Sequence, residues 1–221
     1  MNIIEALETR KSTRAFLDKP VARKKIVEIL RAARHAPSGG NAQPWQVAVV
    51  DGGKKEELVR AMEAAFRKEG PGTMDYDYYP LEWHDPYKNR RIACGSQLYE
   101  ALKIKRQDKV RRQEQWVDNY RAFAAPVILF FFLDPVMQKG SFLDCGMFIQ
   151  SVMLAAIEAE LATCPQAALG QYPLLVKEAL GYGRDTILLC GMALGYEDTE
   201  APINSYRTPR EEVETFTRFF R

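Results

Sequence analysis

The chain has few of the histidine and cysteine side chains on which most hydrolases and zinc enzymes depend. Its 221 residues include two histidines, His35 and His84, and four cysteines without a C-x-x-C pair. A histidine-based zinc site or a Ser-His-Asp triad is therefore hard to assemble, and we expect no metal. Three of the four cysteines lie in or beside apolar runs, so we expect buried, reduced thiols.

Long apolar runs and targeting segments are also missing. The longest apolar run covers residues 124–133, well short of the roughly 20 residues that a membrane helix needs. The N-terminal apolar stretch is too short for a signal peptide. A net charge of +2 argues against a dedicated nucleic-acid binder. These features predict a soluble, cytoplasmic protein with no membrane or nucleic-acid partner, folded as one domain over residues 1–221.

Four familiar catalytic and nucleotide motifs are absent. The chain contains no G-x-G-x-x-G, no G-x-x-x-x-G-K-[ST], no G-x-S-x-G and no H-E-x-x-H. The sequence therefore gives no motif evidence for a dinucleotide fold, a phosphate-binding loop, an esterase or a zinc protease. The remaining devices for binding a phosphate are clusters of Arg with Ser.

Hydrophobic periodicity predicts strands interleaved with helices. We expect helices over residues 3–10, 22–35, 52–70 and 141–161, mostly helical structure over 90–121, and strands over 45–51, 125–134 and 185–196. The segment 141–161 is apolar on nearly every side, which indicates a central buried helix. This order predicts an α+β or α/β sandwich.

One stretch breaks the pattern. Residues 70–88 contain three prolines and several aromatic residues without a clean period. Long irregular segments in compact domains are usually lids or binding segments. We therefore expect a lid excursion over about residues 68–124.

Two Arg clusters are candidate phosphate sites. In an extended segment, Arg10, Ser12 and Arg14 point to one side, and Arg can bind phosphate with two hydrogen bonds. A solvated charge run at a helix C-terminus explains the same residues. The second cluster, Y-R-T-P-R at 206–210, is equally consistent with an exposed basic loop.

The segment P-S-G-G-N-A-Q-P-W at 37–45 is more specific. Its two glycines let the backbone approach a ligand closely, and Ser38 and Asn41 can donate and accept hydrogen bonds. An ordinary helix-to-strand turn is the alternative interpretation.

Three segments in this order resemble the FMN-dependent nitroreductase family. They are R-K-S-T-R-A-F at 10–16, A-P-S-G-G-N-A-Q-P-W at 36–45 and L-A-T-C-P-Q-A-A at 161–168. Residues 78–91 look like the branch that includes nitrobenzoate and quinone reductases. The resemblance implies a homodimer with a mixed, mainly antiparallel sheet flanked by helices. It also implies two FMN sites at the subunit interface.

The resemblance assigns roles to particular residues. Arg10 and Ser12 would bind the phosphate and ribityl side of FMN, and Arg14 would lie at the N1 and O2 edge of the flavin. The segment 37–41 would approach from the partner subunit, and the turn after the Cys-Pro pair would place N–H groups near flavin N5 and O4. The implied cofactor-binding residues are Arg10, Lys11, Ser12, Arg14, Pro37, Ser38, Gly39, Asn41, Pro165, Gln166, Ala167, Ala168 and Arg207, with Arg210 as the alternative to Arg207.

Two departures from the family pattern stand out. Some members carry Glu in the turn where this chain has Gln166, Ala167 and Ala168. The C-terminal Lys-x-Arg of some members is Ser205-Tyr206-Arg207 here, which removes one phosphate cation.

The implied activity is two-electron, ping-pong reduction of a nitroaromatic or quinone by NADPH or NADH through FMN. No catalytic side chain is expected, because the cofactor carries the chemistry. Candidate residues for stacking a flat acceptor are Tyr78, Tyr79, Trp83 and Phe123, which could equally pin the excursion onto the core or onto the other subunit. Alternatives are a flavoprotein that reduces a halogenated aromatic, an enone or free flavin, and a non-catalytic module that binds a phosphorylated ligand.

Overall fold

The core of the molecule is a four-stranded antiparallel sheet. In this computed structural model, which describes residues 2–221, the strands lie in the order β1-β2-β4-β3. Their bounds are Trp45–Asp51 for β1, Val127–Leu133 for β2, Ala162–Gln166 for β3 and Ile187–Gly195 for β4. The only parallel pairing among the described residues is an isolated bridge between Ser12 and Thr163. The predicted α+β fold with a mainly antiparallel sheet is confirmed.

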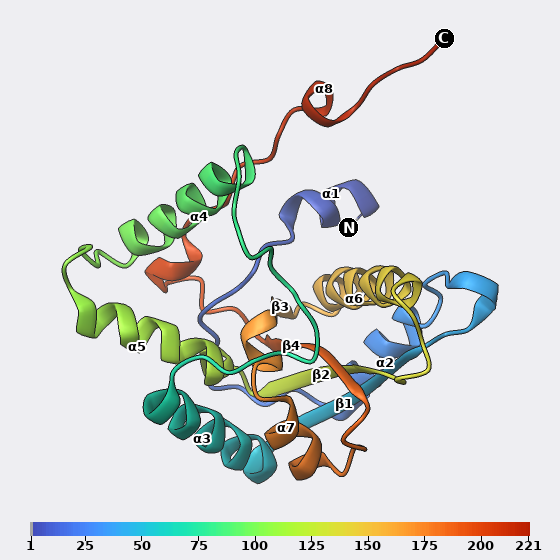
Figure 1. The fold of residues 1–221 in the computed structure, drawn as a ribbon, viewed down its shortest axis with the longest axis horizontal. Helices are drawn as coiled ribbons and strands as arrows, with labels where there is room; N and C mark the ends of the chain where they lie inside the picture. Colours follow the sequence, from blue (N-terminus) through green and yellow to red (C-terminus); the bar gives the residue numbers. More distant parts are fainter. Residues whose placement is uncertain (1) are drawn as a thin grey trace.

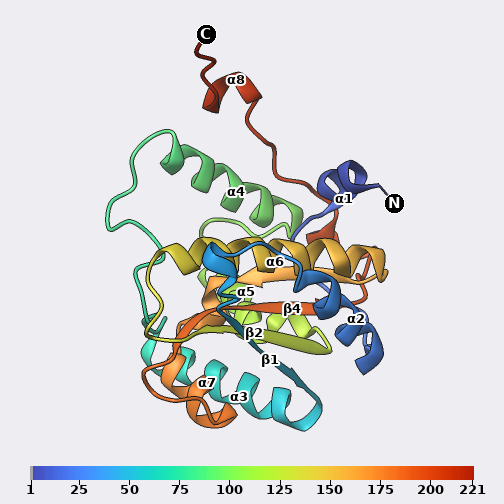
Figure 2. The same cartoon turned by 90° about the vertical axis from the view of Figure 1, so that its right-hand side faces the viewer.

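Helices cover both faces of this sheet. Figure 2 shows α6 and α2 on one side and α3 and α7 on the other. The helices are α1 (Ile3–Thr9), α2 (Arg23–Ala33), α3 (Gly52–Glu69), α4 (Tyr87–Ala101), α5 (Lys109–Tyr120), α6 (Gly140–Glu158), α7 (Pro173–Leu180) and α8 (Val213–Phe216).

Strand β2 supplies side chains to both halves of the core. All seven of its residues are buried. Leu129 and Phe131 belong to the cluster that includes residues of α2 and α6, whereas Phe130 and Phe132 belong to the cluster that includes residues of α3 and α7. Alternating side chains on a central strand produce this division. The apolar run in the sequence is therefore a strand covered on both faces.

Helix α6 is only partly the buried helix that the sequence predicts. Cys145, Phe148 and Val152 are buried against the core. Leu143 is 73% exposed and Met147 40% exposed, so the opposite side is open in the single chain. Among the described helices, α6 alone is long and apolar enough to cross a membrane by length and composition, criteria that the core helix of a soluble protein also meets.

Two elements escaped the sequence prediction. The Cys-Pro segment, expected as a turn, is strand β3. Proline lacks the N–H that a central strand must donate, but β3 lies at the edge of the sheet, where Pro165 is tolerated. Helix α7 was also missed; Pro173 begins it and Gly181 ends it in the left-handed conformation at φ 73°.

Residues 70–86 form the irregular part of the expected excursion and contain bends, turns and unassigned backbone, with no helix or strand. Its continuation, expected to be mostly helical, consists of α4 and α5. Helix α4 has no buried residue and lies above the sheet in Figure 2. The C-terminal tail with α8 extends away from the body of the molecule (Figure 1).

Candidate functional site

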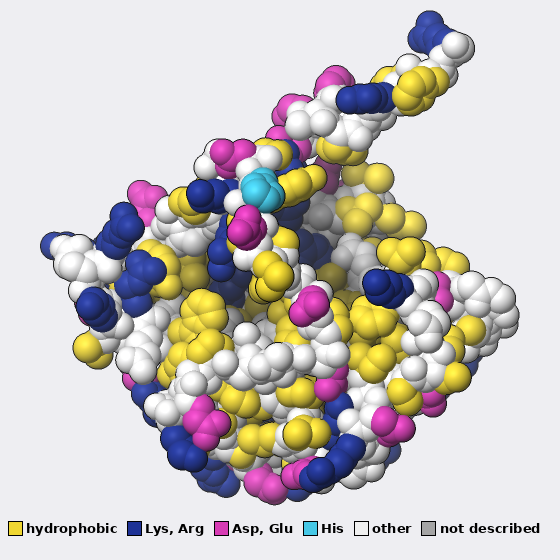
Figure 3. Space-filling view, viewed as in Figure 1, with side chains coloured by type: hydrophobic (Ala, Val, Ile, Leu, Met, Phe, Trp, Pro, Cys, Tyr) yellow, Lys and Arg dark blue, Asp and Glu magenta, His cyan; other side chains and the backbone are white. Residues whose placement is uncertain are grey.

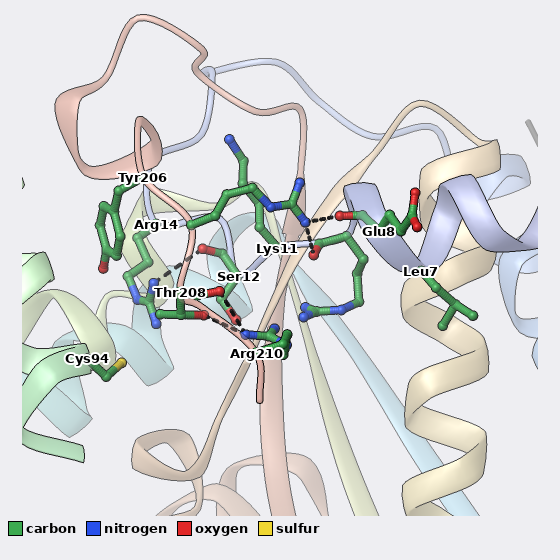
Figure 4. A pocket seen from close by; sticks show the side chains of 11 residues that line it. Leu7, Glu8, Lys11, Ser12, Arg14, Cys94, Tyr206, Thr208 and Arg210 are labelled. Carbon is green, nitrogen blue, oxygen red and sulfur yellow. Dashed lines mark hydrogen bonds between the residues drawn. The ribbon is translucent and has the colours of Figure 1, made fainter. Parts of the chain in front are cut away.

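Two basic segments from opposite ends of the chain meet at one cavity of about 500 Å³, which we call the arginine cavity. Figure 3 shows Lys and Arg side chains inside a hollow beneath the α4 region, and Figure 4 shows the lining at close range. The lining residues are Leu7, Glu8, Arg10, Lys11, Ser12, Arg14, Cys94, Tyr206, Arg207, Thr208 and Arg210. Six residues implied by the sequence are therefore brought together: Arg10, Lys11, Ser12, Arg14, Arg207 and Arg210.

The extended conformation of residues 10–14 follows from how α1 ends. Arg10 has φ −54° and ψ 127°, which takes the chain out of the helix. Beyond it, the N–H of Thr13 donates to the carbonyl oxygen of Thr163 at 3.0 Å. The chain thus runs beside β3, and Arg10, Ser12 and Arg14 all reach the cavity. An extended segment can direct these three side chains to one side, although Lys11 lines the same cavity.

Lys11 has a different role from its neighbours. Its Nζ lies 2.6 Å from a carboxylate oxygen of Glu197 and donates to the carbonyl oxygen of Asn204 at 2.7 Å. This ammonium group already has an anionic partner. In the single chain, Lys11 therefore ties the segment to the loops after β4.

Asn204 is a site residue that the sequence did not reveal. It is 4% exposed, and its Oδ1 accepts the N–H of Arg14 at 2.8 Å. Its Nδ2 donates to the carbonyl oxygens of Ala15 and Asp198. The short sequence around it carries no catalytic motif, so only the folded chain shows that Asn204 holds the backbone at Arg14 and Ala15.

The arginine cavity has an excess of positive charge. Burial, followed by the positive charges of Arg210 and Arg207, lowers the pKa of Arg10. Among residues 2–221, no carboxylate forms an ion pair with the Arg residues at 10, 14, 207 or 210. The carboxylate of Glu8 points away from Arg14 and Arg210 (Figure 4). Several guanidinium groups and the Ser12 hydroxyl form a donor set that suits a phosphate monoester.

The segment 37–41 lies outside this cavity in the single chain. Its residues from Gly39 to Asn41 form a short 3₁₀ turn that contacts α6. Gly40 has φ 59°, a conformation that glycine adopts without cost. Pro37, Gly39 and Asn41 are exposed and Ser38 is half-buried.

The Pro165–Ala168 segment joins the end of β3 to a 3₁₀ turn over Ala167–Gly170. Gln166 is 5% exposed, and its Nε2 donates to the carbonyl oxygen of Asn119 at 2.9 Å. Its side chain therefore points toward α5, and its Oε1 has no hydrogen-bond partner among the described residues. Pro165, Ala167 and Ala168 are half-buried, which leaves backbone available at the sheet edge.

Three of the four candidate stacking residues lie together. The rings of Tyr78 and Tyr79 are 4.6 Å apart and those of Tyr79 and Trp83 are 5.6 Å apart. Tyr78 and Tyr79 are about half exposed. Phe123 lies elsewhere, 6% exposed in the core cluster with Phe130, so it offers no free ring face in the single chain.

Comparisons with known proteins identify relatives of this chain. A model of the nitroreductase family matches residues 7–196. The 4-nitrobenzoate reductase of Pseudomonas putida is 36% identical over 211 residues, 96% of this chain and 92% of that protein. The nitrobenzene nitroreductase of Ectopseudomonas oleovorans is 36% identical over 98% of this chain and 96% of its own length.

A solved structure gives the same result for the fold. The FMN-dependent nitroreductase NfnB from Mycobacterium smegmatis, in complex with NADPH, superposes with a TM-score of 0.92 at 32% identity. The match covers 100% of both chains. The chain belongs to the nitroreductase family.

Proposed function

We propose that this protein is an FMN-dependent reductase that uses NADPH to reduce nitroaromatic compounds. The observation that carries the proposal is the arginine cavity, where four guanidinium groups and the Ser12 hydroxyl converge without a paired carboxylate among the described residues. The relatives at 36% identity are named for nitrobenzoate and nitrobenzene reduction. The M. smegmatis structure is titled as FMN-dependent and holds NADPH.

In this proposal the cavity residues bind the cofactor through its phosphate. Arg10, Ser12 and Arg210 would hold the phosphate, and Arg14 would face the N1 and O2 edge of the flavin. FMN, when bound, supplies the hydride chemistry that no side chain of the chain offers. The chain supplies orientation, and the positive charge of Arg14 favours electron density at that edge. The half-buried backbone at Ala167 and Ala168 would face the opposite edge.

The complete site would require a second copy of the chain. The segment 37–41 does not reach the arginine cavity of its own chain, so its proposed contact with the cofactor would be made in a homodimer. Exposed apolar residues are available to form the subunit interface. They include Ile3 and Leu7 of α1, Leu143 and Met147 of α6, and Phe216, Phe219 and Phe220 of the tail. We place this dimer in the cytoplasm, which suits its four free cysteines.

The exposed rings at Tyr78, Tyr79 and Trp83 are the proposed surface for a flat acceptor. Aromatic side chains stack on planar apolar rings, and the chain anchors this segment to the sheet. The Tyr76 hydroxyl donates to the carbonyl oxygen of Leu189 at 2.8 Å. A quinone would satisfy the same contacts, so both acceptor classes belong in the test.

The test is anaerobic stopped-flow kinetics on protein reconstituted with FMN. We expect NADPH to bleach the flavin absorbance near its visible maximum, and 4-nitrobenzoate or nitrobenzene to restore it. A quinone panel and NADH define the acceptor and donor preferences. Protein that binds FMN but is not reduced by either nicotinamide would overturn the enzymatic proposal and favour a non-catalytic binding module.

A further inference from the structure

Asp144 is a buried acid that nothing in the proposed chemistry uses. It is 8% exposed on the apolar helix α6, whose other acid, Glu158, lies at the far end. Among the described residues, no Lys or Arg forms an ion pair with it. Its Oδ1 accepts the N–H of Gly39 at 3.2 Å. This carboxylate therefore joins α6 to the segment 37–41.

A buried carboxylate without a neighbouring cation lowers the stability of the folded protein. Removing the charge from water is unfavourable, and an apolar side chain of similar size commonly gives equal or greater stability. The rest of the buried face of α6 is made of residues such as Cys145, Phe148 and Val152. Stability of the helix therefore does not explain the acid, whereas its contact with the segment does.

The segment itself needs an external anchor. Gly40, Asn41 and Gln43 all have φ between 49° and 59°, and a non-glycine residue in this region is unfavourable. Internal hydrogen bonds help, including one from the N–H of Gln43 to Ser38 Oγ at 2.9 Å. Among residues 2–221, Asp144 is the only side chain of another element that hydrogen-bonds to the backbone of residues 37–43.

We infer that Asp144 is a positioning residue for cofactor binding in trans. It fixes the segment 37–41 in the conformation that approaches the FMN held by the arginine cavity of the partner subunit. This inference rests on the proposed function, because it requires both FMN binding and the homodimer. It assigns no chemical step to the carboxylate.

The first test compares two replacements of the same residue. Asp144→Leu fills the space without an acceptor, whereas Asp144→Asn keeps an oxygen that can accept the N–H of Gly39. We expect the FMN dissociation constant to rise about ten- to a hundredfold in Asp144→Leu, the range for losing a hydrogen bond to a charged group. We expect Asp144→Asn to restore it to within about threefold of the wild type. Ser151→Ala, which removes a hydroxyl that donates within α6 to Met147, is the matched control.

Gly39→Pro tests the same contact from the other side. Proline removes the N–H donor, and Ser38 already has the extended backbone, φ −147° and ψ 150°, that a residue before proline prefers. This variant and Asp144→Leu should weaken FMN binding similarly, and the double variant should be no worse than either alone. Fully additive losses would mean that the two residues act independently, against the inference.

Mixed dimers test whether the effect acts across the interface. One chain carries Arg10→Ala and Arg210→Ala, and its tagged partner carries Asp144→Leu. If the segment serves the partner's cavity, one site has both defects and the other has neither. FMN titration should then give one site per dimer with wild-type affinity. Two weakened sites would show that the segment acts within its own chain.

The outcomes distinguish a failure of the role of Asp144 from a failure of the proposed FMN-dependent function. Wild-type protein that fails to bind FMN would refute the proposed function. Wild-type protein that binds FMN, together with a folded, dimeric Asp144→Leu variant of unchanged affinity, would refute only the role of Asp144. Thermal unfolding and sedimentation of each variant establish that it is folded and dimeric.

Discussion

Arg207 donates from Nη1 to the carbonyl oxygen of Thr9 at 2.9 Å, and its Nη2 donates to the carbonyl oxygens of Glu8 and Arg10. These carbonyls belong to the C-terminal end of α1, where a cation is favourable. Within residues 2–221, Arg210 instead hydrogen-bonds only to the neighbouring Thr208 and Pro209. The two arginines therefore have different partners within the same cavity.

This difference predicts that replacing each arginine with alanine has a different effect on FMN affinity and on thermal stability. Arg210→Ala should weaken FMN binding by about 1.5–3 kcal/mol with little change in thermal stability, because it loses a charge-assisted bond to phosphate. Arg207→Ala should lower both affinity and the unfolding temperature, because it also releases the end of α1. FMN fluorescence titration and thermal unfolding measure the two effects. Equal loss of stability in both variants would contradict the distinction.

The cysteines offer a chemical test of the cavity. Burial raises the pKa of Cys145 and Cys164 to about 11 and that of Cys190 to about 12, so the thiolate of each is scarce at pH 8. Cys94 is exposed and lines the arginine cavity. We expect iodoacetamide to label Cys94 selectively at pH 8, and FMN to slow that labelling.

Peptide mass spectrometry locates the labelled thiol. The reaction of Cys145, Cys164 and Cys190 should increase only as the pH approaches 11 or as the protein unfolds. Labelling of Cys94 at the same rate with and without saturating FMN would argue that the cofactor does not occupy the cavity beside it.

A buried ion pair anchors the irregular segment 70–86 to helix α7. Lys177 is 1% exposed, and its Nζ lies 2.8 Å from Asp75 Oδ2, which also accepts the N–H of Leu188. Asp75→Ala should reduce the free energy of unfolding by about 3–5 kcal/mol, because it leaves Lys177 buried and unpaired. Asp75→Ala combined with Lys177→Met should recover part of that loss. Urea unfolding measures both, and a loss below about 1 kcal/mol in the single variant would contradict the account.

The aromatic residues of the segment 70–86 should affect the affinity for the acceptor and not the affinity for FMN. Tyr79→Ala removes the ring between Tyr78 and Trp83, and we expect the KM for a nitroaromatic to rise about threefold to tenfold, the value of one aromatic contact. The FMN dissociation constant is the internal reference. Steady-state kinetics with 4-nitrobenzoate that show an unchanged KM would remove Tyr79 from the proposed acceptor surface.

Much of the fold could be predicted from periodicity, because the core elements repeat at helical or strand spacing. The apolar run before Asp134 is strand β2, and the predicted helix over 22–35 contains α2. Strand β3 was missed because Pro165, its fourth residue, argues against a strand unless the strand is known to lie at an edge. That knowledge requires the strand order, which no local pattern contains.

The candidate site was predictable for a different reason. Residues 10–14 and 206–210 are rich in Arg. The resemblance of the chain to a known family predicts that both segments contribute to one cofactor site. Asn204 and Asp144 are single polar residues whose importance lies in contacts across 190 and 105 positions. No spacing rule links residues so far apart. Phe123 lies in the core cluster, which is the alternative that the sequence leaves open for the aromatic residues of this region.

In the proposed function, the arginine cavity binds the phosphate of FMN. The most direct measurement is calorimetric titration of the apoprotein with FMN and with riboflavin, which lacks the phosphate, at low and high salt. We predict one FMN per chain, at least about hundredfold weaker binding of riboflavin, and a salt dependence confined to FMN. Equal affinity for FMN and riboflavin, or FMN affinity unchanged in Arg10→Ala with Arg210→Ala, would contradict the claim.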